Sequence, residues 1–218
     1  MNDLVLYDLA LNGCLFQRGS AFILGRFNGE SFSCVSKSGS QNLWLPFRVT
    51  TGLKVFNPKG VSGASNNRTL YEAAKTYYDA QDCLAKLNLA PKPLEMIEIN
   101  LTFEKSSTPM ESWSCYGVIM ERVFSGGVHQ VLKNLQRFGV TIPDHLYSLI
   151  SECDYEALTL QEYKLFGVQE DKIAELQNKI LRQIPQGFNI GLDLLTPTNI
   201  VLDENGEPKV VDFDYCNI

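Results

Sequence analysis

Residues 191–214 read GLDLLTPTNIVLDENGEPKVVDFD and carry the most specific pattern in the chain. Two short apolar runs, one after Asn199 and one before Asp212, flank a polar segment that contains Asn205-Gly206. Apolar runs of this length, separated by Asp, Glu, Asn and Gly, are typical of a β-hairpin. We therefore expect a tight hairpin that carries Asn199 at its first end and Asp212 at its last.

Such a hairpin brings its two ends side by side, so Asn199 and Asp212 are expected to face one site. An amide oxygen and a carboxylate are ligands that suit Mg²⁺, which binds few protein groups and keeps several of its waters. Asp214, two residues after Asp212, is a further oxygen ligand for the same place. The sequence thus predicts a magnesium site at the open end of the hairpin.

Outward from this segment, the first half of the chain is dominated by strand patterns. Residues 21–37 alternate around Asn28-Gly29, which is a strong hairpin signal. Further strands are expected at residues 43–45, 52–56, 94–103 and 116–123, with one helix at 68–87. After Ser125-Gly126-Gly127 the pattern becomes helical, and helices are expected at residues 128–138, about 144–152 and 170–184.

Composition excludes several classes of protein. The 218 residues carry a net charge of −6, so the chain lacks the basic surface of a nucleic-acid binder. Six scattered cysteines without a Cys-x-x-Cys pair, and only two histidines, argue against a zinc site and for reduced thiols. No stretch is apolar enough to span a membrane, and the acidic N-terminus is unlike a signal peptide. These features predict a cytoplasmic protein.

Three motifs in the C-terminal stretch resemble the catalytic and metal-binding segments of the protein kinase-like superfamily: Asp193, Pro-x-Asn-Ile-x-Leu ending at Leu202, and Val-Val-Asp-Phe around Asp212. The resemblance implies an α+β, two-lobed kinase-like fold. Residues 1–123 would form a β-rich N-lobe, and residues 124–218 a strongly reduced helical C-lobe. It also implies an ATP- and Mg²⁺-dependent phosphotransferase, with ATP and Mg²⁺ as cofactors.

The resemblance assigns a role to each candidate residue. Asp193 would be the catalytic group that orients the acceptor hydroxyl, and Asn199 and Asp212 would hold the metal. Lys54, in the middle of a predicted strand, would contact the phosphates and take part in catalysis. Glu72, 18 residues later on the predicted helix, would pair with Lys54.

Two further parts of the nucleotide site are less distinct in sequence. Gly39 and Ser40 are our choice for the phosphate-covering loop, 15 residues before Lys54. The rival loops are Gly25–Gly29 and Gly19–Phe22. The backbone groups of Glu121 and Val123, at the end of the last predicted strand, would bind the adenine edge.

The sequence also departs from the superfamily. Asn199 follows Asp193 by six residues where the family has five, and Gly191-Leu192 replaces the usual His-containing pair. The chain stops four residues after Asp214, where a protein kinase continues into its activation segment. We therefore expect a minimal serine/threonine kinase, similar to compact effector kinases that bacterial pathogens deliver into host cells without a classical signal peptide. A protein substrate or activating partner is expected. The alternatives are an inactive pseudokinase that serves as a binding module and a small-molecule kinase.

Overall fold

The chain forms two compact units. The first comprises Met1–Asp79 and Lys92–Arg122, and the second comprises Ala80–Pro91 and Val123–Ile218. We predicted a boundary after residue 123; the break follows Arg122, and residues 80–91 group with the second unit. The structure, a computed structural model, describes residues 4–12, 19–38, 42–56, 69–104, 111–142, 157–186, 188 and 194–213.

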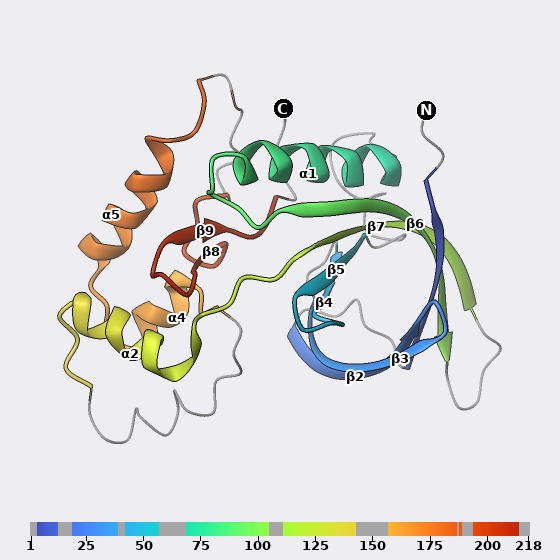
Figure 1. Cartoon of the computed structure of the whole chain (residues 1–218), viewed down its shortest axis with the longest axis horizontal. Helices are drawn as coiled ribbons and strands as arrows, with labels where there is room; N and C mark the ends of the chain where they lie inside the picture. Colours follow the sequence, from blue (N-terminus) through green and yellow to red (C-terminus); the bar gives the residue numbers. More distant parts are fainter. Residues whose placement is uncertain are drawn as a thin grey trace. The chain divides into compact units, whose positions relative to one another are not determined.

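The first unit is built on a closed barrel of seven strands (Figure 1). Around the barrel the strands follow the order β1-β2-β3-β4-β5-β7-β6. All neighbours are antiparallel except β1 and β6, which pair in parallel and close the sheet. The strands are β1 (Leu6–Asn12), β2 (Gly19–Phe27), β3 (Glu30–Ser38), β4 (Asn42–Leu45), β5 (Thr51–Phe56), β6 (Pro93–Glu104) and β7 (Glu111–Glu121).

The hairpin predicted around Asn28-Gly29 is confirmed. Phe27 pairs with Glu30, which leaves a two-residue turn between β2 and β3. Both turn residues have positive φ, 51° at Asn28 and 87° at Gly29. A two-residue hairpin turn whose backbone twist matches the strands needs positive φ at both positions, and Asn-Gly meets this need at little cost. Local sequence therefore fixes the register of these two strands.

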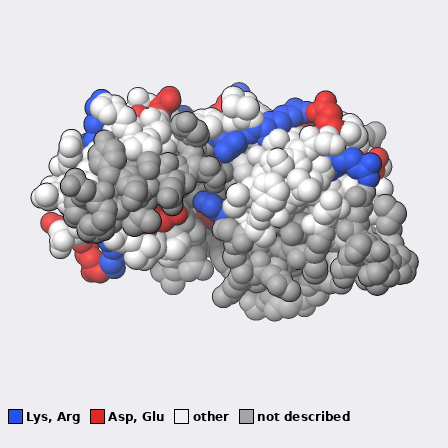
Figure 2. Space-filling model, turned by 90° about the horizontal axis from the view of Figure 1, so that it is seen from below, with Lys and Arg blue, Asp and Glu red and all other residues white. Residues whose placement is uncertain are grey.

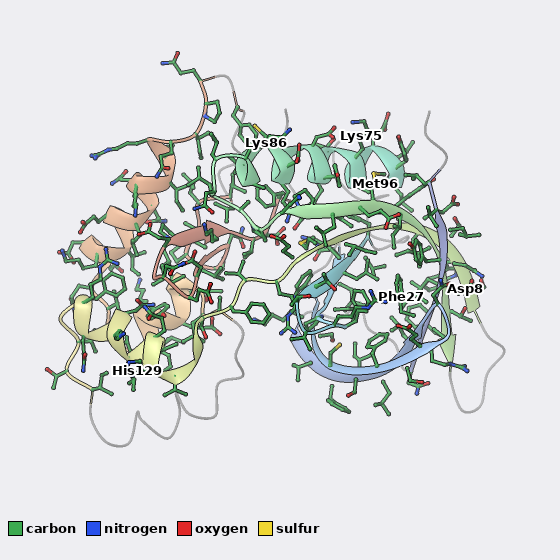
Figure 3. The ribbon with its side chains drawn as sticks, viewed as in Figure 1. Asp8, Phe27, Lys75, Lys86, Met96 and His129 are labelled. Carbon is green, nitrogen blue, oxygen red and sulfur yellow. The ribbon has the colours of Figure 1, made fainter. Side chains whose placement is uncertain are left out.

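Alternation along the strands fills the barrel with apolar side chains. Phe27 lies inside, where its ring stacks on Tyr7 with centroids 5.2 Å apart, whereas Asp8 lies on the outer side (Figure 3). Because successive strand residues point to opposite faces, every second position enters the interior. The buried interior cluster is Leu9, Leu11, Ile23, Phe27, Cys34, Leu43, Leu45, Leu53, Val55, Ile97, Ile99, Leu101, Phe103 and Cys115.

The outer face of β2 and β3 is apolar at its centre. Phe22 is 69% exposed and lies opposite Val35, which is 42% exposed. Figure 2 shows a field of uncharged side chains over the described part of the barrel on the side seen from below. On β1 and β6 the outer face is polar instead: Asn100 Nδ2 donates to Asp8 Oδ1 at 3.1 Å. The two sides of the barrel thus differ in chemistry.

The second unit combines helices with a small hairpin (Figure 1). Asn134 is buried and donates to the Tyr163 hydroxyl at 3.1 Å, and burial raises the pKa of Tyr163 to about 12. Its described elements are α2 (Gly127–Arg137), α4 (Leu160–Leu165), α5 (Glu170–Leu181), β8 (Ile200–Leu202) and β9 (Pro208–Val210); the last turns of α1 (Leu70–Ala85) also belong here.

The predicted two-lobed kinase-like fold is wrong. Of the residues that the structure describes, 39% lie in strands and 28% in helices, and seven strands close into a mixed barrel. The closure depends on β1, a segment to which the sequence pattern gave no strand. Leu9 and Leu11 turn into the interior, and the backbone of β1 pairs with β6 on one side and β2 on the other. Burial of both leucines favours the closed sheet.

Candidate functional site

The C-terminal hairpin forms as predicted. Ile200 pairs with Val210, and the Val211 amide donates to the Asn199 carbonyl at 2.9 Å. This last bond places Asn199 across from Val211, so Asp212 is the next residue along the partner strand. Residues of β8 and β9 are buried, whereas Asn199 and Asp212 are partly exposed. The two polar residues therefore lie at one open end of an otherwise buried hairpin.

Hydrogen bonds within the turn hold the other end of the hairpin. Asp203 Oδ1 accepts from the Asn205 and Glu207 amides, each at 2.9 Å. The Gly206 amide donates to the Asp203 carbonyl, also at 2.9 Å. A carboxylate that accepts hydrogen bonds from the amides two and four residues ahead replaces the backbone hydrogen bonds that a turn lacks. The hairpin is thus a defined unit with little freedom at its turn.

The loop that leads into the hairpin is anchored to two helices. Gln177 Nε2 of α5 donates to the Leu195 carbonyl at 2.5 Å. The Gln161 amide, at the start of α4, donates to the Pro197 carbonyl at 3.0 Å. Sequence reasoning missed Gln177, because nothing local marks its side chain as a partner of a loop. Asp193, the predicted catalytic residue, and Asp214 lie outside the described residues.

The side-chain oxygens at the open end of the hairpin fit a magnesium ion that keeps part of its hydration shell. Asn199 and Asp212 offer one amide oxygen and one carboxylate, and Thr198 Oγ1 donates to Asn199 Oδ1 at 3.4 Å. In the described part of the chain, no three His, Cys, Asp or Glu side chains form a group that could hold a metal. Mg²⁺ does not need one, because it is commonly held by one or two protein oxygens, water and phosphate. The residues therefore suit a metal carried by a phosphate ligand.

Lys54 lies outside the barrel interior and is nevertheless buried. Its neighbours Leu53 and Val55 enter the core, so its own side chain leaves the opposite face of β5. It is 4% exposed, and its Nζ lies 4.3 Å from the centre of the Tyr77 ring of α1. A lysine over an aromatic ring is stabilised by the ring's negative face. The sequence identified Lys54, but not its aromatic neighbour.

Glu72 is engaged at the start of α1. Its Oε2 accepts from the Thr69 amide at 2.8 Å, and the Glu72 amide donates to Thr69 Oγ1 at 3.2 Å. These reciprocal bonds make a capping box, which satisfies amides at a helix N-terminus. Tyr77, which contacts Lys54, lies five residues further along α1 than Glu72, and the pairing of Lys54 with Glu72 stays a prediction.

Trp44 adds an aromatic surface beside Lys54. Trp44 lies directly opposite Lys54 in the β4–β5 register, and its side chain is partly buried. A Cβ placed on Gly52 would lie 2.0 Å from the indole, so the ring occupies the space over this glycine. Gly52, Trp44 and Lys54 thus share the outer face of two neighbouring strands.

The predicted phosphate loop, Gly39 and Ser40, lies outside the described residues. Both rival loops fall in the barrel sheet. Gly19–Phe22 is the first part of β2 and pairs with β3. Gly25 also belongs to β2, opposite Phe32, and Gly29 completes the hairpin turn. A Cβ on Gly25 would lie 2.7 Å from the Phe32 ring, so this glycine serves close packing between strands. The Gly25–Gly29 segment is therefore part of the barrel.

Protein groups already use part of the predicted adenine-binding backbone. The Glu121 amide donates to the Lys92 carbonyl at 2.9 Å. The Val123 carbonyl accepts from the Ala157 amide at 3.3 Å. These two backbone groups are therefore engaged within the protein.

Comparison with known proteins adds no assignment. No protein-family model matches the chain, and no curated protein matches it. In the described segments, we find no helix with the length and apolarity that crossing a membrane requires. The residues at the end of the hairpin are therefore the main guide to function.

Proposed function

We propose that the chain is an ATP- and Mg²⁺-dependent phosphotransferase, acting as a minimal serine/threonine kinase on a protein partner. The observation that carries the proposal is the bond between Val211 and Asn199, which sets Asn199 and Asp212 at one end of the hairpin. Support also comes from Lys54, a buried cation on an aromatic ring. The proposal rests on these residues and not on a kinase-like fold.

Each residue has a role that follows from its chemistry. Asn199 and Asp212 would hold the Mg²⁺ that neutralises the phosphate charge, and Lys54 would stabilise phosphate oxygens. Asp193 would orient the acceptor hydroxyl and take its proton. The hydroxyl oxygen forms a bond to the γ-phosphorus as the bond to the ADP oxygen breaks. Positioning and charge neutralisation supply most of the rate acceleration in such reactions.

A second candidate is a nucleotide-binding module that transfers no phosphate. The specific observation in its favour is the six-residue step from Asp193 to Asn199, which lengthens the loop that would hold the acceptor. In this candidate function the cation site binds Mg²⁺, but no phosphate is transferred.

Labelled ATP separates the two candidates. The purified chain is incubated with γ-labelled ATP, Mg²⁺ and a cell lysate, and the label on protein is measured. Asp212→Ala should lose at least about a hundredfold of the transfer, because removing a group that neutralises transition-state charge costs roughly that much. Asp171→Ala, an exposed carboxylate on α5, is the matched control and should label as wild type.

The outcomes point to different conclusions. Equal labelling by wild type and Asp212→Ala would refute the assignment of this carboxylate. A rise in melting temperature with ATP and Mg²⁺, without any labelled protein, would favour the binding module. If neither labelling nor a shift occurs, both candidates are wrong.

A further inference from the structure

A buried ammonium group belongs to the hairpin itself and has no part in the proposed reaction. Lys209, the middle residue of β9, is 7% exposed. Its Nζ donates to both the carbonyl and the side-chain oxygen of Asn88, each at 2.6 Å. It also lies 3.5 Å from Asp203 Oδ2, in the turn of the hairpin. One charge thus joins the turn to the segment that follows α1.

The backbone around this group reinforces the connection. Asn88 has a left-handed backbone with φ of 58°, and the next carbonyl, that of Leu89, accepts from the Val210 amide at 2.8 Å. β9 is therefore bonded to β8 on one side and to Leu89 on the other. A buried charge is costly unless its donors are satisfied, so Lys209 strongly favours the arrangement that supplies all three acceptors.

We propose that Lys209 is the positioning residue for the Asn199/Asp212 cation site, an inference that rests on the proposed function. Asp212 lies three residues beyond Lys209, about 10 Å along an extended chain. Fixing Lys209 fixes how far β9 extends past β8, and this sets where the Asp212 carboxylate stands relative to Asn199. Groups that orient metal ligands without touching the metal typically change metal affinity by about ten- to a hundredfold.

Binding of Mn²⁺ tests this role without depending on turnover. Mn²⁺ replaces Mg²⁺ as the probe, and its electron paramagnetic resonance signal reports bound and free ion in the presence of ATP. Binding that disappears in Asp212→Ala defines the site. Lys209→Met keeps the length of the side chain and removes the charge, and we expect its Mn²⁺ affinity to fall about tenfold or more.

A second lysine provides the matched control. Lys179 of α5 pairs with Glu207 of the same hairpin turn, but from an exposed position. Lys179→Met should bind Mn²⁺ as wild type does. Asn88→Gly keeps the left-handed backbone and removes one of the two close acceptors. It should lower the affinity less than Lys209→Met, and it tests the inference even if Lys209→Met does not fold.

Each outcome bears on a different statement. If folded Lys209→Met and Asn88→Gly bind Mn²⁺ as tightly as wild type, the positioning role is wrong and the cation site stands. If wild type shows no binding that depends on Asp212, the cation site and the positioning role are both wrong. If Lys179→Met loses as much affinity as Lys209→Met, any damage to the turn suffices, and the specific role of Lys209 is refuted.

Discussion

Substitution of Gly52 by alanine tests the packing that surrounds Lys54. A Cβ at this position would lie 2.0 Å from Cη2, 2.3 Å from Cζ2 and 2.8 Å from Cζ3 of Trp44, whereas real Cβ atoms stay beyond 3.0 Å. Gly52 is not among the glycines with positive φ, so alanine suits its backbone. The three atoms nearest to the added Cβ all belong to the indole, so the ring must move to admit one methyl group.

The expected cost follows from what the ring can do. Overpacking a well-filled site costs about 1–3 kcal/mol. The indole is partly exposed and can swing outward, which relieves the overlap but gives up its contact with β5. We therefore expect the free energy of unfolding to fall by about 2 kcal/mol, in the middle of that range. Trp44→Leu should remove most of the clash, so adding Gly52→Ala to it should cost less than about 0.5 kcal/mol.

Urea unfolding of the four proteins in this double-mutant cycle measures the coupling. Emission provides a second readout: the chain has two tryptophans, and Trp113 is replaced by phenylalanine so that only Trp44 reports. Gly52→Ala should shift that emission to longer wavelength, because the indole becomes more exposed. A cost below about 0.5 kcal/mol, or an equal cost in the Trp44→Leu background, would refute the packing that we describe.

Two further predictions concern stability. Burial raises the pKa of Cys115 and of Tyr163 to about 12. The folded chain therefore keeps protons on these groups that the unfolded chain loses from pH about 9 upward. The free energy of unfolding should fall as the pH rises from about 9 to 12, by up to about 1.4 kcal/mol per pH unit for each group. In Cys115→Ala the free energy of unfolding should fall less steeply between pH 9 and 10. An unchanged dependence on pH, measured by urea unfolding, would contradict this. Thr159→Ala removes the capping box of α4 and should lower the free energy of unfolding in urea by about 1 kcal/mol. Thr159→Ser should restore most of the loss. A Thr159→Ala protein as stable as wild type would show that the cap is not needed.

Local signals predicted most of the elements. Asn28-Gly29 gave the β2–β3 hairpin, and the apolar runs on either side of Asn205-Gly206 gave β8 and β9. Alternating or three-to-four spacing located β4, β5, α1, α2 and α5 within a few residues. The predicted helix at about 144–152 lies outside the described residues. Where a turn or a periodic face encodes the structure, reading the sequence was enough.

The elements that depend on distant partners were not predicted. β1 has a short apolar pattern whose partner, β6, lies some 90 residues away, and no local signal encodes that pairing. α4 has only six residues, too few for a helical period, although Thr159 and Glu162 carry its capping signal. Missing β1 meant missing the closure of the barrel, and hence the fold class.

The same limit applies to the candidate site. The hairpin that places Asn199 beside Asp212 is local in sequence, so its geometry was predictable. Which residues of α1 approach Lys54 depends on how the helix packs on the sheet, so spacing alone did not identify Tyr77. The lysine that holds the hairpin, Lys209, was not identified, because its acceptor Asn88 is 121 residues away.

The parallel pairing of β1 with β6 has a consequence for how a newly made chain acquires its shape. Leu6 meets Glu98, so the first strand leaves the ribosome 92 residues before its second neighbour exists. At usual rates of synthesis this is a delay of about 5–20 s. During that time the growing sheet has unpaired strand edges, which invite pairing with other chains. Yield in the cell should therefore depend on chaperone supply and on the speed of translation between β1 and β6.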